Sequence, residues 1–335
     1  MYDQQYYKAW YKKNREKQLL WGKEYYEDHK EHILQMHKNW AKRNVDQTGS
    51  VWRKYGRRRR IKNPNIDKEY RLRKKARLKK IFFLVGLPRA GNTLLSSILN
   101  QNPDIAVTPN SLTPDILYHT FQLKNGGIFK NFPDHLSLNN IAHHVLDYYY
   151  KDWKQSYIID RSPWGTPTNL KILKETQKNI KIIVLTRDLI EVLASHIRWS
   201  HKNPNNFIDR SNFKTRKEQC DYLMNLVMIS KNLQGIKNLL SKENKSLCHF
   251  VKYNDLVKNP QRIIKEIYDY LEIPSFEHRY TNLDQFEVNG IKYNDTSLGK
   301  GLHSIRTDCI RKSEDDAYEL IPDAVVKEHR KEWLL

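Results

Sequence analysis

The chain has 335 residues, with 59 Lys and Arg against 38 Asp and Glu, for a formal net charge of +21. Its three cysteines, Cys220, Cys248 and Cys309, form no CxxC or Cys/His spacing, so the sequence suggests neither a disulfide framework nor a zinc site. No apolar run approaches the ~20 residues that span a bilayer, and the N-terminus has no apolar signal core. We expect a soluble cytoplasmic protein with no metal and no membrane partner.

The first 78 residues carry most of the excess charge. Residues 1–80 hold 25 basic and 9 acidic side chains, a net of +16. A 15-residue repeat that starts at Lys8, Lys23 and Lys38 predicts short basic helices, and it resembles basic repeats beside enzyme domains in phage and large-virus proteins. Either Lys, Arg, Trp and Tyr bind nucleic acid or another polyanion, or the arm is a solvated helical extension.

The packed core is expected to begin near residue 79. Residues 81–85 form an apolar run that predicts a buried parallel strand, and a glycine-bearing turn and a helix over 94–99 follow. Backbone N–H groups and the helix dipole converge on such a turn, which predicts an anion site. Residues 86–93 match the P-loop pattern G-x-x-x-x-G-K-[ST] in every position but one, because Asn92 stands in the place of the lysine.

That substitution bears on the chemistry. A nucleoside-triphosphate enzyme needs the lysine on the β- and γ-phosphates and a hydroxyl on Mg²⁺. Here the cation is Arg89, inside the loop. A P-loop nucleotide kinase and a nucleic-acid-binding protein that acts through the arm both remain open alternatives.

Further along the chain, two strands end in arginines. Residues 157–160 lead into Arg161, and residues 181–187 end in Arg187, eight residues before Ser195 on the following helix. An arginine at the end of a strand and a hydroxyl on the next helix can bind one phosphate together. The fourth strand, near residues 247–253, ends at Tyr253.

A glycine- and basic-rich segment lies near the C-terminus. Gly299 and Gly301 would permit a mobile lid, and the segment is either that or an exposed basic loop. The basic residues that could reach phosphates from it are Arg306, Arg311 and Lys312.

Together these elements predict an α/β fold. We expect a P-loop-like parallel sheet flanked by helices on both faces over residues 79–335, with a basic helical N-terminal extension over residues 1–78. Helices near 215–242 and 260–271 should cover the sheet. Loops at 108–150 and 200–214 should build the substrate pocket.

The motifs and their order along the chain resemble those of the sulfotransferases that depend on 3′-phosphoadenosine-5′-phosphosulfate (PAPS). The loop resembles the family pattern [GT]-x-P-[RK]-[SA]-G-[TSN]-[TS], and Arg187 with Ser195 resembles its R-x7-S pair. The resemblance spans roughly residues 80–335 and is closest to bacterial and phage-type members, with a distant similarity to protein-tyrosine sulfotransferases. It implies that PAPS donates a sulfuryl group to an acceptor hydroxyl or amine, without a metal, and leaves 3′,5′-ADP.

The resemblance also implies residue roles. Arg89 and Arg161 would stabilise the transferring group, and Arg187 with Ser195 would bind the 3′-phosphate. The implied nucleotide-binding residues are Pro88, Arg89, Ala90, Gly91, Asn92, Thr93, Leu94, Arg187, Ser195, Tyr253, Arg306, Arg311 and Lys312.

The general base is the least determined of the implied roles. Asn110 stands where protein-tyrosine sulfotransferases have their glutamate, and an amide cannot accept the proton, which argues against tyrosine sulfation. The nearest acid is Asp115, which would serve either as the base or as a helix N-terminal carboxylate after Pro114. His119 and His196 are the other candidates.

Overall fold

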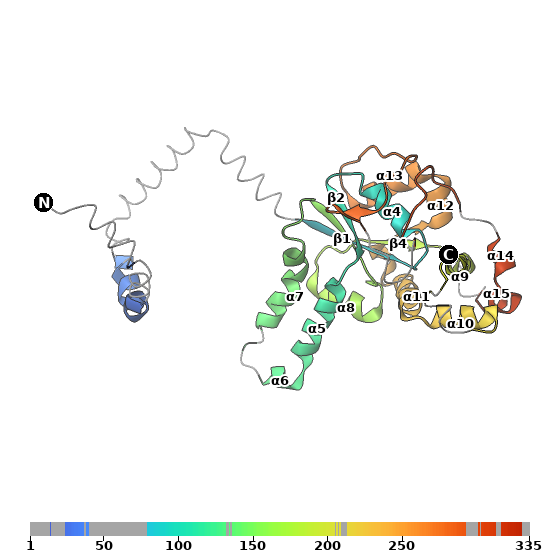
Figure 1. The fold of residues 1–335 in the computed structure, drawn as a ribbon. Coiled ribbons are helices and arrows are strands. Elements are labelled where there is room, and N and C mark those ends of the chain that lie inside the picture. Colours follow the sequence, from blue (N-terminus) through green and yellow to red (C-terminus); the bar gives the residue numbers. More distant parts are fainter. Residues whose placement is uncertain are drawn as a thin grey trace. The chain divides into compact units, whose positions relative to one another are not determined.

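A computed structural model of the chain describes residues 14, 24–36, 38–39, 79–131, 134, 136–204, 206, 208, 213–292, 301, 303–312 and 316–329. The chain divides into two compact units, Met1–Lys75 and Ala76–Leu335 (Figure 1). In the first unit, residues 24–36 are helical. The rest of the predicted arm, including the arginines at 57–60, lies outside the described residues.

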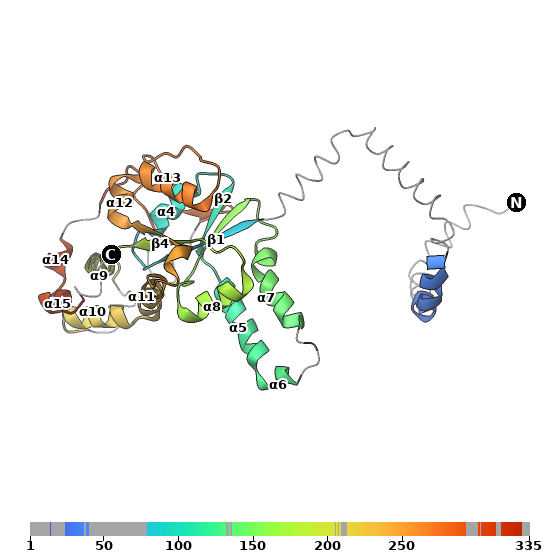
Figure 2. The same ribbon diagram turned by 180° about the vertical axis from the view of Figure 1, so that it is seen from behind.

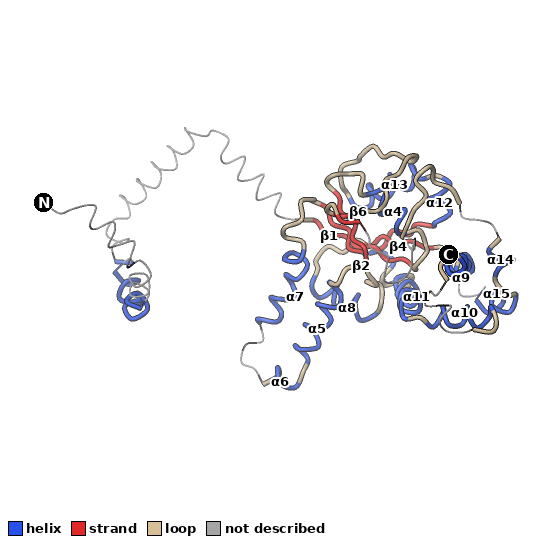
Figure 3. Tube along the Cα trace, viewed as in Figure 1, coloured by secondary structure: helices blue, strands red, loops and turns tan. Residues whose placement is uncertain are grey.

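The second unit is built on a parallel sheet of five strands in the order β2-β3-β1-β4-β5. Each connection between consecutive strands runs through at least one helix, as parallel pairing requires. Figure 3 shows the strands gathered between the helices. The strands are β1 (Lys80–Gly86), β2 (Ile105–Asn110), β3 (Tyr157–Arg161), β4 (Ile182–Thr186) and β5 (Cys248–Lys252).

Helices cover both faces of this sheet (Figures 1 and 2). The longer helices are α4 (Asn92–Leu99), α5 (Thr113–Asn125), α7 (Leu136–Tyr149), α8 (Pro167–Thr176), α9 (Leu189–His201), α10 (Arg216–Asn225), α11 (Val227–Leu239) and α13 (Pro260–Leu271). The shorter elements are α6 (Gly127–Lys130), a 3₁₀ turn (Lys245–Leu247), α12 (Tyr253–Lys258), the hairpin β6 (Glu287–Val288) and β7 (Ile291–Lys292), α14 (Ala317–Leu320) and α15 (Asp323–His329).

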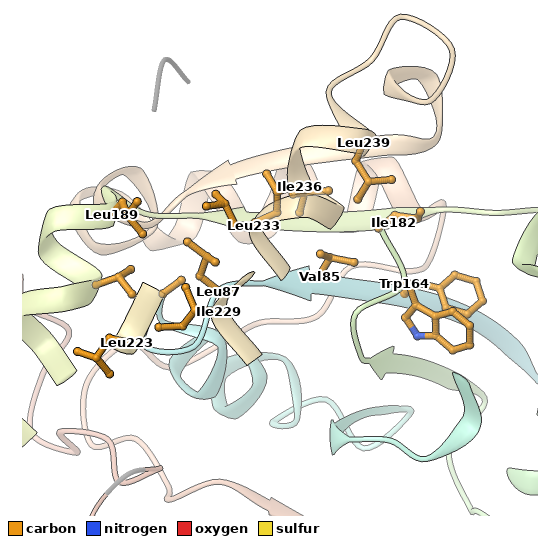
Figure 4. Close-up of a cluster of buried hydrophobic side chains, with 14 of the residues drawn as sticks. Val85, Leu87, Trp164, Ile182, Leu189, Leu223, Ile229, Leu233, Ile236 and Leu239 are labelled. Atoms are coloured by element: carbon orange, nitrogen blue, oxygen red, sulfur yellow. The ribbon is translucent and has the colours of Figure 1, made fainter. Parts of the chain in front are cut away.

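The central strand β1 is apolar throughout because both of its faces are buried. Successive side chains of a strand point to opposite faces. Phe82 and Leu84 therefore pack in one cluster with α4, α12 and α13, while Phe83 and Val85 pack in the other with α8, α9 and α11. Figure 4 shows the second cluster, in which α11 presents Ile236 toward the sheet.

The predicted α/β class, the four predicted strands and the helices predicted near 215–242 and 260–271 are confirmed. The edge strand β2 was missed, because its apolar run is only Ile105–Val107 and Pro109 interrupts it. A proline is tolerated at an edge, where one side of the strand makes no ladder. The prediction of a pocket-building loop over residues 108–150 was wrong, since α5, α6 and α7 occupy most of it.

One buried carboxylate holds β3 to the helices. Asp160 is fully buried, and its two oxygens accept four side-chain hydrogen bonds: from Ser111 (2.9 Å), Thr113 (2.6 Å), the Tyr150 hydroxyl (2.6 Å) and the Trp164 indole N–H (3.0 Å). Burial raises the pKa of Asp160, and these donors oppose that rise. The network joins β3 to the start of α5 and to the end of α7.

We expect Tyr150→Phe to lower the free energy of unfolding by about 1–3 kcal/mol, because the buried Asp160 carboxylate loses a donor. Tyr149→Phe is the matched control, since Tyr149 is the exposed neighbour, and it should change stability by less than about 0.5 kcal/mol. Urea unfolding measures both. Equal effects of the two substitutions would contradict the role of the Asp160 network.

Candidate functional site

A cavity of about 840 Å³ lies at the carboxyl ends of the strands. Every strand of the parallel sheet contributes to its lining, through Gly86 of β1, Asn110 of β2, Arg161 of β3, and Arg187 and Tyr253 just after β4 and β5. After β1 the chain forms β2 and β3 on one side of β1. It then crosses to the other side of β1, where it forms β4 and β5. Ligands of open α/β sheets bind at such a switch point.

The turn between β1 and α4 has the geometry of an anion cradle. Arg89 and Gly91 have positive φ angles of 63° and 94°, and Gly91 is the N-cap residue of α4. Ala90 N–H donates to the Leu87 carbonyl at 3.1 Å and closes the turn. Residues 91–94 at the start of α4 line the cavity, and the first N–H groups of a helix can bind an anion.

Asn92, at the lysine position of the P-loop pattern, stabilises the turn. Its side chain is 3% exposed, and its Nδ2 donates to the Leu87 carbonyl at 2.7 Å. Its Oδ1 lies against Gly86, where a Cβ would come within 2.3 Å of it. The Asn92 side chain is neutral and stabilises the turn. The positive charge of this site therefore comes from other residues.

Arg187 is held from three sides. Its Nε donates to Glu191 Oε2 at 3.0 Å, its Nη1 donates to the carbonyl of Arg89 at 2.7 Å, and its guanidinium carbon lies 4.2 Å from the centre of the Tyr253 ring. The side chains of Arg187 and Glu191 are 5% and 13% exposed. The Glu191 carboxylate balances the charge of the buried Arg187. The Tyr253 ring orients the plane of the Arg187 guanidinium group.

The loop arginine meets the residues of α9. Arg89 Nε donates to Ser195 Oγ at 3.1 Å, which brings together the loop and both members of the R-x7-S pair. His196, the next residue, is 2% exposed, and neither ring nitrogen has a hydrogen-bond partner within the described chain. Burial, and secondarily the charge of Arg89, lowers the pKa of His196 to about 3, so this imidazole is neutral.

The cavity is strongly basic. Its lining has seven cationic side chains: Arg89, Arg161, Arg187, Arg198, Lys202, Arg306 and Arg311. None of the described residues that line it is Asp or Glu. Such a concentration of one sign of charge selects an anionic ligand.

The C-terminal segment that carries Arg306 and Arg311 is hydrogen-bonded to the segment that follows α13. Thr281 and Cys309 form an isolated antiparallel bridge, and Gln285 exchanges hydrogen bonds with the backbone of Ile305. Lys312 Nζ lies 4.0 Å from Glu191 Oε1, so the same carboxylate faces both Arg187 and this segment. Gly301 has a φ of 74°, and Gly299 lies outside the described residues.

Most of the sequence-predicted site residues meet in this cavity. Those that line it are Pro88, Arg89, Gly91, Asn92, Thr93, Leu94, Arg161, Arg187, Ser195, Tyr253, Arg306 and Arg311. Ala90 is buried beneath the turn, and Lys312 contacts Glu191 without lining the cavity. Asp115 is exposed in the first turn of α5, and neither it nor His119 belongs to the lining.

The sequence reasoning missed a second set of lining residues. They are Arg198 and Trp199 of α9, and Tyr222, Leu226, Met228 and Asn232 of α10, α11 and the residue between them. Lys202 and Asn203 also line the cavity and belong to the predicted pocket loop at 200–214. The signal available was helical spacing, because residues 198, 199 and 202 follow Ser195 at i+3, i+4 and i+7. Only the cavity that α9 shares with α10 and α11 distinguishes that face from any other amphipathic face.

The described residues contain no cluster of His, Cys, Asp and Glu that could hold a metal ion. Among the same residues, no helix is both long and apolar enough to cross a bilayer.

We expect Gly91→Ala to destabilise the protein, because its Cβ would lie 2.6 Å from the Tyr253 ring and its φ of 94° disfavours any side chain. Gly290→Ala is the matched control, with a φ of 77° and nothing within 4 Å. The control isolates the backbone penalty of about 1–2 kcal/mol. Thermal unfolding should show a larger loss for Gly91→Ala, and equal losses would mean that the Tyr253 ring can move aside.

Comparison of the sequence with known proteins identifies its family. The model of the sulfotransferase family matches residues 82–278, from β1 past α13. The Caenorhabditis briggsae protein named "Putative protein-tyrosine sulfotransferase" is 24% identical over 202 residues, which are 58% of this chain and 65% of that protein.

Solved structures of sulfotransferases resemble the fold. Mouse sulfotransferase SULT7A1 complexed with PAP is 15% identical, with a TM-score of 0.48 over 76% of this chain and 83% of that one. The sulfotransferase domain from the Synechococcus PCC 7002 olefin synthase is 16% identical, with a TM-score of 0.44 over 72% and 93%. Since the family model spans more than half of the sequence, the chain belongs to the sulfotransferase family.

Proposed function

We propose that the enzyme transfers the sulfuryl group of PAPS to an acceptor hydroxyl or amine by in-line displacement, without a metal. The observation that carries this proposal is the convergence of Arg89, Arg161 and Arg187 on one cavity whose described lining has no carboxylate. PAPS is a polyanion with a phosphosulfate at one end and a 3′-phosphate at the other. The basic lining of the cavity is complementary to such a ligand.

The turn before α4 is assigned to the 5′-phosphosulfate. Its N–H groups and the Thr93 hydroxyl would hold the phosphate, and Arg89 would face the same group. The neutral Asn92 supports sulfuryl rather than phosphoryl transfer, since a kinase would need a lysine at this place for its β- and γ-phosphates. Pro88 and Leu94 line the cavity on either side of the turn.

Arg187 and Ser195 are assigned to the 3′-phosphate. Glu191, the Arg89 carbonyl and the Tyr253 ring already fix the orientation of Arg187, so little freedom is lost when the phosphate binds. Arg306 and Arg311 of the C-terminal segment would add charge to the nucleotide, and Lys312 would act through Glu191.

Arg161 is assigned to the transferring group. During displacement, negative charge grows on the oxygen that bridges sulfur and phosphorus, and fixed cations lower the barrier by stabilising it. Arg161 ends β3 beside β1 and lines the cavity, which supports this role. Asp115 receives no proton-transfer role in this proposal, because it is absent from the described lining.

Binding of nucleotides to the full-length protein tests the donor site. Calorimetry should show a preference for 3′,5′-ADP over both 5′-AMP and ATP with Mg²⁺, and Arg187→Ala should weaken 3′,5′-ADP binding by about 10- to 100-fold, the worth of a charged hydrogen bond. The binding of 5′-AMP should hardly change. Arg262→Ala is the matched control, because Arg262 pairs with Glu266 on the exposed side of α13. ATP binding equal to that of 3′,5′-ADP would refute the proposal and favour a nucleotide kinase.

Metal removal tests whether protein side chains, rather than a metal ion, supply the positive charge that stabilises the transferring group. We expect EDTA to leave the sulfuryl-transfer rate within about twofold, because protein arginines supply the compensating charge. Addition of Mg²⁺ should restore nothing. A rate that falls with EDTA and returns with Mg²⁺ would contradict the metal-independent mechanism.

A further inference from the structure

The edge strand β2 changes register just before it passes Arg161. Residues 105–107 pair with β3 in one register, but Asn110, rather than Pro109, then stands opposite Arg161. One extra residue of β2 is therefore accommodated before Asn110, which makes this place a β-bulge. Pro109 suits a bulge, because a proline has no N–H to donate to the ladder.

The bulge decides which side chain lies beside Arg161. Because side chains alternate along a strand, residues that stand opposite each other point to the same face of the sheet. Arg161 stands opposite Leu84 of β1 and Asn110 of β2, and all three line the cavity. In a regular strand Pro109 would occupy that place, and Asn110 would point to the other face. Bulges next to active sites commonly redirect a side chain in this way.

Thr108 lies within the bulge and holds the backbone of Arg161. It is 2% exposed, and its Oγ1 accepts a hydrogen bond from the Arg161 N–H at 2.8 Å. In a regular parallel ladder, a backbone carbonyl of the neighbouring strand accepts from such an N–H. A buried N–H without an acceptor is unfavourable, so the Thr108 hydroxyl stabilises the end of β3 in this position.

The other backbone groups around Arg161 are hydrogen-bonded as well. Ser111 N–H donates to the Arg161 carbonyl at 3.0 Å, and Ser162 N–H donates to the Leu84 carbonyl at 3.2 Å. The hydroxyl of Ser162 also donates to the Ser111 carbonyl at 3.0 Å. Arg161 is the last residue of β3, yet both neighbouring strands fix its backbone.

A fixed backbone matters here because of the role assigned to Arg161. A cation that stabilises developing charge acts best when it is in place before the reaction begins. The arginine side chain has many rotamers, so a fixed Cα limits the positions that the guanidinium group samples. Productive geometry tolerates displacements of about 0.5 Å, and a 1 Å displacement can cost about 100-fold in rate.

We propose that Thr108 is a positioning residue: through its hydrogen bond to the Arg161 N–H, the bulge of β2 holds the Arg161 guanidinium group against the transferring sulfuryl group. This proposal rests on the proposed function. Thr108 is absent from the described lining of the cavity, so it acts through Arg161 and touches no ligand. Its effect is therefore confined to ligands that carry the sulfuryl group.

Binding of PAPS and of 3′,5′-ADP to the full-length protein tests the proposal, because the two ligands share the nucleotide and only PAPS carries the sulfuryl group. Thr108→Val keeps the branched shape and removes the acceptor. Calorimetry should show the Kd for PAPS raised by about 3- to 10-fold, part of the worth of a charged hydrogen bond. The Kd for 3′,5′-ADP should stay within about twofold. Thr108→Ser retains the hydroxyl and should bind both ligands as the unaltered protein does.

Thr176→Val is the matched control. Thr176 is also buried, at 8% exposed, and its hydroxyl donates to the Ile172 carbonyl at 2.9 Å within α8, outside the described lining. This substitution should leave both dissociation constants within about twofold. Thermal unfolding checks that the variants fold. Thr108→Ala, made in parallel, also removes the acceptor and gives the same comparison if the valine variant does not fold.

A double-mutant cycle tests whether Thr108 acts through Arg161. Arg161→Ala alone should raise the Kd for PAPS by about 10- to 100-fold, because the sulfuryl group loses a charged hydrogen bond. Thr108→Val added to Arg161→Ala should raise it no further than about twofold, since the side chain that Thr108 positions is gone. A general loss of structure would instead lower the affinity again in the double variant.

Failure of this proposal differs from failure of the proposed function. If Arg161→Ala weakens PAPS binding and Thr108→Val does not, or if the double variant loses further affinity, the positioning role is overturned and the donor site stands. Equal effects of Thr108→Val on PAPS and 3′,5′-ADP overturn the positioning role as well. If Arg161→Ala leaves PAPS binding unchanged, the role assigned to Arg161 in the proposed function is itself overturned.

Discussion

The site depends on how a buried cation is compensated. Arg187 is nearly inaccessible to solvent, and an unpaired charge at such a position would destabilise the fold by several kcal/mol. Glu191, one helical turn away on α9, provides the opposite charge, while the Arg89 carbonyl and the Tyr253 ring fix the remaining orientation. The arginine is thereby placed before any anion arrives, and the loop, α9 and the start of α12 are tied to one another around it.

Helix α9 organises the site along its length. Its N-cap, Asp188, accepts hydrogen bonds from Ile190 N–H (2.8 Å) and Glu191 N–H (3.2 Å), and its other oxygen accepts one from Tyr318 (2.8 Å). Glu191 in the first turn compensates the charge of Arg187, Ser195 in the middle accepts a hydrogen bond from Arg89, and Trp199 near the end lines the cavity. One helix thus places residues along the cavity from Ser195 to Trp199.

The scaffold that supports the basic lining is mostly apolar. Two apolar clusters on the faces of the sheet and the Asp160 network stabilise the strands, and the strand ends then carry arginines into a shared space. Repulsion among these arginines opposes folding. Anion binding relieves that repulsion, so the proposed donor would stabilise the protein as well as react in it.

Local sequence determined the elements and the chemistry of the donor side. Apolar runs fixed β1, β3, β4 and β5, and the glycine-bearing turn with Arg89 indicated an anion site, because these properties depend on neighbouring residues alone. Tertiary structure decided the rest. It showed that Asn92 braces its own loop, that Arg89 meets Ser195 across 106 residues, and that α10 and α11 line the same cavity as α9. It also placed Asp115 outside the cavity lining. Those facts depend on which helix faces pack together. The i, i+3 and i+4 spacing in the sequence identifies the residues that share a helix face, but it does not identify the element on which that face packs.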